Sequence, residues 1–187
     1  MTCVIGYIDK EGVYIGGDSA AISQDDLSYN IRTDEKVFMK GEFIIGFSTS
    51  FRMGQLLRYK FRIPSHPKGM EDHKFMSTLF IDAVKKCFDE NDYTDMMTSD
   101  GGCFMVGYKG RLYVILSDYQ VANPKENFAA LGCGEFLALG AMYASTEKDP
   151  IKKMEIALNA AVTFSMGVKP PFTFVKILNK KRTPRKK

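Results

Sequence analysis

The feature that most constrains the fold is a series of short, nearly continuous apolar runs separated by tight turns. Residues 3–8 and 13–15 flank an Asp-Lys-Glu-Gly turn, and residues 36–39 and 43–47 flank a Lys-Gly-Glu turn. Runs of this length, rich in β-branched and aromatic residues and joined by glycine-containing turns, predict β-hairpins. Because their apolar character barely alternates, we expect these strands to be covered on both faces.

Helical signals occur in four segments. The clearest is residues 71–90, in which apolar side chains recur at three- and four-residue steps and so form one stripe. The other predicted helices are residues 51–61, which follow Ser48-Thr49-Ser50, residues 135–145, and residues 150–166, which begin at a proline suited to a first helical turn. The remaining predicted strands are residues 103–108, 112–116 and 172–178.

This order of elements predicts the fold class. The strands need cover on both faces, and each helix has one apolar stripe to bury. Both requirements are met if two sheets pack on each other and helices lie on both outer faces. We therefore expect an α+β, four-layer αββα sandwich. The chain has 187 residues and no long Pro-, Ser- or Gly-rich interruption, so we expect a single domain over residues 2–178.

Composition narrows the cellular setting. No apolar run reaches the 18 or so residues that span a bilayer, and the N-terminal segment has neither a basic start nor a cleavage site. The four cysteines, Cys3, Cys87, Cys103 and Cys133, form no CxxC pair and no zinc-like spacing. Free thiols are typical of a reducing compartment, so we expect a cytoplasmic protein without structural disulfides.

Basic residues are concentrated at the C-terminus. Residues 179–187 hold six of the 26 Lys and Arg residues and no acidic residue, which leaves 20 basic and 22 acidic residues in the rest of the chain. The net charge of +4 is therefore a property of the tail. We expect residues 179–187 to be a solvated, disordered terminus; contact with nucleic acid is the alternative.

The second residue is the first candidate for chemistry. If Met1 is removed, Thr2 carries both a hydroxyl and a free α-amine, whose ordinary pKa of about 7.7–8.0 suits it to accept the hydroxyl proton. Asp18 ends the second strand of the first hairpin, which should bring it beside Thr2. A buried ammonium from Lys36 beside Asp18 would lower the pKa of the nearby amine. Singly, Asp18 also fits a turn and Lys36 a solvated position.

Four sequence segments together carry a resemblance to a known family. They are TCVIG and GVYIGGDS at residues 2–6 and 12–19, DEKVF at residues 34–38, and GCGEFLALG at residues 132–140. In this order they resemble proteasome β subunits and the bacterial HslV-type peptidase, from Thr2 to about Leu178. The resemblance implies an N-terminal nucleophile hydrolase fold and a threonine-type endopeptidase, with Thr2 as nucleophile and Asp18 and Lys36 orienting and polarising it.

The resemblance also implies further site residues and partners. A backbone N–H near Ser50 and that of the turn at Cys133 would hold the oxyanion. Ala21, Ser48 and Arg52 resemble residues beside the nucleophile that contact substrate, and Arg52 would favour acidic side chains. Members of the family enclose their sites in stacked homo-oligomeric rings fed by an ATPase unfoldase, act on polypeptides and need no cofactor.

Three positions depart from the family pattern. Cys133 stands where the family usually has serine, and a thiol is a poorer hydrogen-bond donor than a hydroxyl. Thr163 lies about where an acid is common, with Ser165 as a partial substitute, and Ser50 lies where glycine is favoured. A second hypothesis is therefore a structural, ring-forming homologue whose catalytic site has decayed. His66 and His73 give no strong sign of a metal site.

Overall fold

Two antiparallel sheets form the centre of the molecule. The computed structural model describes residues 1–23, 28–93 and 102–179. In the first sheet the strand order is β10-β1-β2-β11, and in the second it is β5-β6-β7-β8-β9. The first sheet comprises β1 (Val4–Ile8), β2 (Gly12–Gly17), β10 (Phe128–Leu131) and β11 (Thr173–Leu178). The second comprises β5 (Val37–Lys40), β6 (Phe43–Phe47), β7 (Phe104–Tyr108), β8 (Arg111–Ile115) and β9 (Val121–Ala122).

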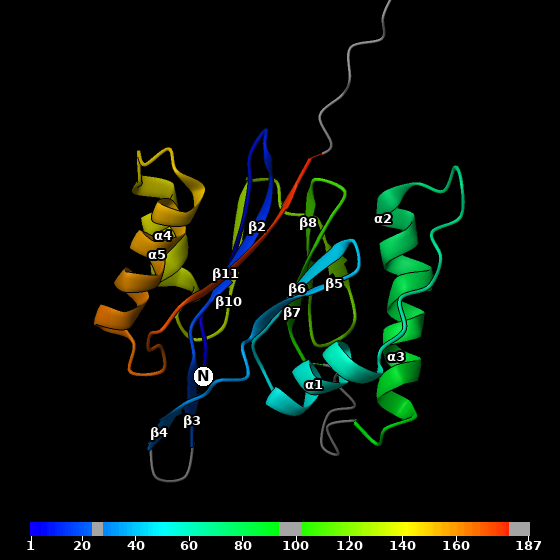
Figure 1. Ribbon diagram of the computed structural model, residues 1–187, viewed down its shortest axis with the longest axis horizontal. Coiled ribbons are helices and arrows are strands. Elements are labelled where there is room, and N and C mark those ends of the chain that lie inside the picture. Colours follow the sequence, from blue (N-terminus) through cyan, green and yellow to red (C-terminus); the bar gives the residue numbers. More distant parts are fainter. Residues whose placement is uncertain (24–27, 94–101, 180–187) are drawn as a thin grey trace, which may run out of the picture.

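Helices cover the outer face of each sheet, as Figure 1 shows. The first sheet is covered by α4 (Glu135–Ala144) and α5 (Pro150–Phe164). The second is covered by α1 (Phe51–Gln55), η1 (Leu56–Lys60), α2 (Asp72–Phe75), η2 (Met76–Phe80) and α3 (Ile81–Asp89). The two predicted helices 51–61 and 71–90 are each present as one run that contains a π-helical turn, η1 or η2.

Three apolar clusters correspond to the three interfaces between layers. One lies between the two sheets and includes Val4, Ile15 and Ile44, all fully buried. The second lies between the second sheet and its helices, and the third between the first sheet and α4 and α5. This arrangement confirms the predicted αββα sandwich, because each strand of these two sheets contributes side chains to two of the clusters.

Local sequence explains where the helices begin. The Ser50 side chain accepts hydrogen bonds from the backbone N–H groups of Arg52 and Met53, which caps α1. Asp149 caps α5 in the same way, and Pro150 follows it in the first turn. Within the three described ranges every helix is too short or too polar to cross a bilayer.

Four strands were not predicted from the sequence. Of these, β10 pairs with the free edge of β1, with Val4 opposite Leu131. The strands β3 (Ala20–Ile22) and β4 (Tyr29–Ile31) form a separate ribbon that extends beyond the first sheet (Figure 1), and β9 is a two-residue edge. Of the predicted tail, Asn179 is described and donates from its backbone N–H to Glu11; residues 180–187 lie outside the described part.

Candidate active site

The first hairpin brings the start of the chain next to Asp18. In the β1–β2 register Val4 lies opposite Gly17, and the backbone N–H of Asp18 donates to the Cys3 carbonyl at 3.2 Å. Thr2 and Asp18 are both buried, with exposed fractions of 2% and 1%. The hairpin geometry expected from the sequence is therefore present at the position of the candidate nucleophile.

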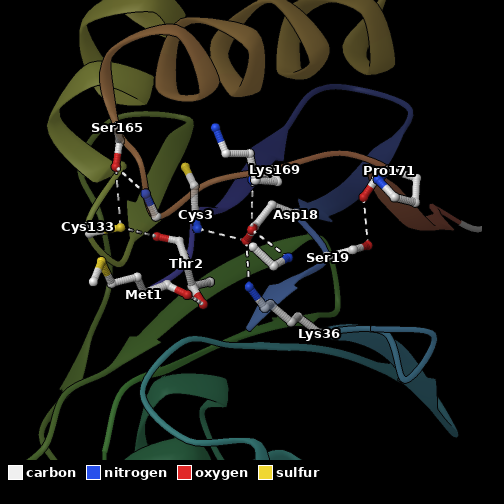
Figure 2. A network of polar contacts seen from close by, with 12 residues as sticks. Met1, Thr2, Cys3, Asp18, Ser19, Lys36, Cys133, Ser165, Lys169 and Pro171 are labelled. Carbon is white, nitrogen blue, oxygen red and sulfur yellow. Dashed lines mark hydrogen bonds and ion pairs between the residues drawn. The ribbon is translucent and has the colours of Figure 1, made fainter. Parts of the chain in front are cut away.

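The Asp18 carboxylate is the centre of a buried polar network, shown in Figure 2. Its Oδ1 accepts from the Lys36 ammonium at 2.7 Å and from the Cys3 N–H at 3.0 Å. Its Oδ2 accepts from the N–H groups of Ala20 at 3.0 Å and Lys169 at 3.3 Å. Four donors, one of them a cation, suit an ionised carboxylate that is held in a single orientation.

Lys36 is the cation of this network and comes from the second sheet. It immediately precedes β5 and is 1% exposed, so its ammonium lies between the two sheets. Burial lowers the pKa of Lys36 below its ordinary value, and the Asp18 carboxylate opposes that shift. The ion pair thus fixes the start of the chain against a strand of the other sheet.

A tight turn before α4 surrounds the Thr2 carbonyl. The backbone N–H of Gly134 donates to that carbonyl at 3.3 Å, and the Cys133 thiol contacts it at 3.5 Å. The same thiol lies 3.5 Å from the Ser165 hydroxyl, as Figure 2 shows. Gly132 has φ +97°, and a Cβ there would lie 2.3 Å from the Thr2 oxygen, so the turn accepts only glycine without rearrangement.

Met1 and Thr2 both line a surface cavity. The Thr2 hydroxyl donates to the Met1 carbonyl at 2.5 Å. The adjoining cavity has a volume of about 460 Å³. Its lining residues are Met1, Thr2, Ser48, Thr49, Cys103, Leu116, Leu131, Gly132, Cys133 and Glu135. Loss of Met1 would join the space that it occupies to this cavity.

The other predicted site residues are distributed around this centre. Ser48 lines the cavity, and its hydroxyl donates to the Cys103 carbonyl at 3.2 Å. Ser50 caps α1, Arg52 is exposed in α1, and Ala21 is half-buried in β3; the cavity lining does not include these three. Their roles toward substrate stay predictions.

The positions that depart from the family pattern have clear local contacts. The Thr163 hydroxyl donates to the Asn159 carbonyl at 2.9 Å within α5, so this contact is directed along its own helix. Ser165 follows α5 and accepts from the Gly167 N–H at 3.4 Å while contacting Cys133. Ser165, rather than Thr163, is the polar side chain from this segment that reaches the turn around Thr2.

Sequence reasoning missed several residues around the site. Ser19 is buried and donates to the Pro171 carbonyl at 2.6 Å, which ties the strand end after Asp18 to the segment before β11. The Thr49 hydroxyl accepts from the Cys103 N–H at 2.8 Å and Thr49 lines the cavity. Only a pairing between distant segments brings these groups together, and no local sequence signal marks it.

Cys3, His66 and His73 take part in packing and hydrogen bonds within the fold. Cys3 packs between the first sheet and its helices, and burial raises the pKa of its thiol to about 12. His66 bonds to Tyr108 and His73 to the Val121 carbonyl. In the described ranges no group of three or more His, Cys, Asp or Glu residues could hold a metal ion.

The two packed sheets with their helical layers define the N-terminal nucleophile hydrolase fold of the proteasome type. The sequence matches no family model and no curated protein. The structure is similar to Thiobacillus denitrificans BPH in complex with epoxomicin, with TM-score 0.79, 15% identity, and 95% of this chain and 99% of that chain covered.

Two further solved structures extend the likeness. Eukaryotic HslV from Trypanosoma brucei matches with TM-score 0.64 and 14% identity over 95% of this chain and 99% of that chain. The Anbu complex from Pseudomonas aeruginosa, a helical assembly, matches with TM-score 0.66 and 15% identity over 95% of this chain and 81% of that chain. At such low identities the matches establish a shared fold over nearly the full length.

Proposed function

We propose that this chain is a threonine-type endopeptidase that hydrolyses peptide bonds through Thr2 once Met1 has been removed. The observation that carries the proposal is the buried ion pair between Lys36 and Asp18, 2.7 Å apart, packed directly against the first strand behind Thr2. Burying both charges is costly unless they are paired and held by further hydrogen bonds. A buried ion pair close to a threonine that lines a cavity would hold and polarise that threonine as a nucleophile.

In the proposed reaction the Thr2 hydroxyl oxygen attacks the carbonyl carbon of a substrate peptide bond. The liberated Thr2 amine takes the hydroxyl proton and passes it to the departing amine of the substrate, which leaves an ester on Thr2. Water then attacks the ester and releases the carboxylic acid, while Thr2 regains its hydroxyl proton. Lys36 and Asp18 act as positioning residues, and backbone N–H groups of the turn at Cys133 and near Ser50 stabilise the oxyanion.

The second hypothesis, a decayed structural homologue, also has support. The turn around Thr2 carries the Cys133 thiol, a weak donor at 3.5 Å from the Thr2 carbonyl, where the related family usually has a serine. No carboxylate from α5 contacts Thr2 within the part of the chain that the structure describes. Both features weaken the polar support of the nucleophile without changing Thr2, Asp18 or Lys36.

An intact-mass measurement followed by labelling with epoxomicin separates the two hypotheses. We expect the purified protein to lack Met1 and to gain the mass of one epoxomicin molecule, with the modified residue mapped to Thr2 by peptide sequencing. Thr2→Ala should abolish the adduct. Thr78→Ala is the matched control, because it removes an exposed hydroxyl on η2, and it should leave the adduct unchanged.

Retention of Met1, or a processed protein that stays unlabelled, would support the decayed homologue instead.

We further propose that the domain over residues 2–178 self-associates, acts on polypeptides in the cytoplasm, and works with an ATPase unfoldase. The exposed apolar residues Phe136, Tyr143 and Phe164 on α4 and α5 support self-association. Residues 179–187 remain a proposed solvated tail.

A further inference from the structure

Glu135 is the charged side chain that lines the cavity at Thr2. It is the first residue of α4 and follows the turn whose members Gly132 and Cys133 touch Thr2. Its backbone N–H donates to the Gly132 carbonyl at 3.0 Å, which fixes Glu135 relative to the nucleophile. A carboxylate at a helix N-terminus interacts favourably with the helix dipole.

The charges around the cavity leave the Glu135 carboxylate uncompensated. Among the residues that the structure describes, Glu135 forms no ion pair, and the other lining side chains are neutral. Lys36 does not line the cavity, and its ammonium is paired with the Asp18 carboxylate at 2.7 Å. Hydrolysis of the Met1–Thr2 peptide bond removes the Met1 ammonium and leaves a new α-amine on Thr2, which as the proposed proton acceptor must be neutral when catalysis begins.

The rest of the cavity suits the stem of a long side chain. Leu116 and Leu131 give apolar surface, and Ser48 and Thr49 give hydroxyls on the opposite sequence segment. Lysine and arginine combine an apolar stem with a charged head, and they bury the stem while the head stays near water. Glu135 is half-buried, so a cation beside it would be partly shielded from solvent.

We propose that Glu135 is a specificity-determining residue and that this cavity selects substrates with a lysine or arginine side chain next to the scissile bond. The inference rests on the proposed threonine peptidase function. It gives the site a preference opposite to that expected from Arg52, which is exposed in α1 and is not part of the cavity lining.

The test compares three sets of quenched fluorescent peptides that differ only in having Lys, Leu or Glu on either side of the cut. The Met1-processed protein is measured beside its Glu135→Gln, Glu135→Asp and Glu155→Gln variants. Glu155 is an exposed residue of α5 and provides the matched control. Protection by each peptide against epoxomicin labelling of Thr2 is measured in parallel, so that slow turnover still gives a result.

We expect kcat/KM to be about 3- to 10-fold higher for Lys than for Leu, as for a partly exposed ion pair, and lowest for Glu. The Lys-to-Leu ratio should fall to about one in Glu135→Gln and persist in Glu135→Asp and Glu155→Gln. Higher salt should reduce it. Hydrolysis or protection without a charge preference, or a preference that survives Glu135→Gln, overturns this inference alone. Absence of hydrolysis and labelling in every variant overturns the proposed function, and this inference with it.

Discussion

Tyr113 places a polar atom in the apolar core. Its side chain is fully buried between the second sheet and its helices, and its hydroxyl has no hydrogen-bond partner within the described residues. An unsatisfied buried hydroxyl costs free energy of about 1–3 kcal/mol. Burial also raises the pKa of Tyr113 from 10.0 to about 12, because the phenolate is poorly solvated there.

We expect Tyr113→Phe to raise the free energy of unfolding by about 1 kcal/mol at pH 7. The gain should grow at high pH. Between pH 10 and about 12 the unfolded chain releases a proton from Tyr113 that the folded chain retains. The free energy of unfolding of the wild type is therefore unaffected by this group's titration below pH 10 and falls as pH rises above it. The phenylalanine variant has no such loss. Urea denaturation at pH 7 and pH 11 measures both effects.

Tyr108 provides the matched control for this prediction. It is also buried in the same cluster, but its hydroxyl lies 2.9 Å from His66 Nδ1. The same substitution, Tyr108→Phe, should therefore lower the free energy of unfolding, by about 1 kcal/mol. If the two variants changed stability in the same direction, the argument from the unpaired hydroxyl would be wrong.

At the scale of elements, the turn before α4 is the connection on which the site depends most. Gly132 and Gly69 both have positive φ, +97° and +84°, so alanine at either position costs about 1–2 kcal/mol of backbone strain. They differ in what a Cβ would meet. At Gly132 it would lie 2.3 Å from the Thr2 carbonyl oxygen, whereas at Gly69 it would meet no atom within 4 Å.

We expect Gly132→Ala to destabilise the protein by about 1–3 kcal/mol more than Gly69→Ala, because Thr2 must move to relieve the overlap. The rate of epoxomicin labelling should fall about 100-fold, since a shift of about 1 Å at the nucleophile is enough for such a loss. Gly69→Ala should label at the wild-type rate. Thermal unfolding and a labelling time course measure the two effects, and equal losses in both variants would contradict this account.

Local sequence patterns predicted most of the helices and strands but few of the contacts between them. The hairpins β1–β2 and β5–β6 and the helices were predictable because their apolar residues are continuous or periodic. The strand β10 was not, since two of its four residues are alanines and its pairing with β1 joins segments more than 100 residues apart. The strand β4 has only three residues, all exposed, which is too short a run for an apolar pattern to predict it.

The same limit applies to the site. Proximity of Thr2 and Asp18 follows from one hairpin, which the sequence specifies. For Lys36 the sequence left two possibilities, a buried position beside Asp18 and a solvated one, and the family resemblance favoured the first, because the place of Lys36 depends on how two sheets pack. Among the residues that complete the cavity, Leu131 and Glu135 flank the turn before α4, whereas Leu116 follows β8. No periodicity or spacing in the sequence predicts that these two segments meet.

At the scale of the whole molecule, the outer layer formed by α4 and α5 is unusually apolar. Phe136 and Tyr143 lie seven residues apart on one face of α4 and are 80% and 82% exposed, and Phe164 at the end of α5 is 76% exposed. Gly140 lies between them on the same face, where a Cβ would meet no atom within 4 Å. Figure 1 shows these helices as the outermost layer on their side of the first sheet.

Such a face is typical of a surface that is covered in an assembly, and the gap at Gly140 allows a second helix to approach closely. We propose that a second copy of this chain covers it. The double substitution Phe136→Glu and Tyr143→Glu should weaken self-association at least about 30-fold, because large aromatic residues at an interface commonly contribute 2 kcal/mol or more. Light scattering coupled to gel filtration, over a concentration series, measures the shift in mass.

Tyr59 supplies the control for the assembly. It is 71% exposed on η1, in the helical layer of the other sheet, so Tyr59→Glu adds one negative charge at a similar aromatic residue far from α4. That variant should retain the wild-type mass. If Tyr59→Glu dissociates the protein and the α4 double variant does not, copies associate through the opposite layer. The apolar face of α4 and α5 would then need another explanation.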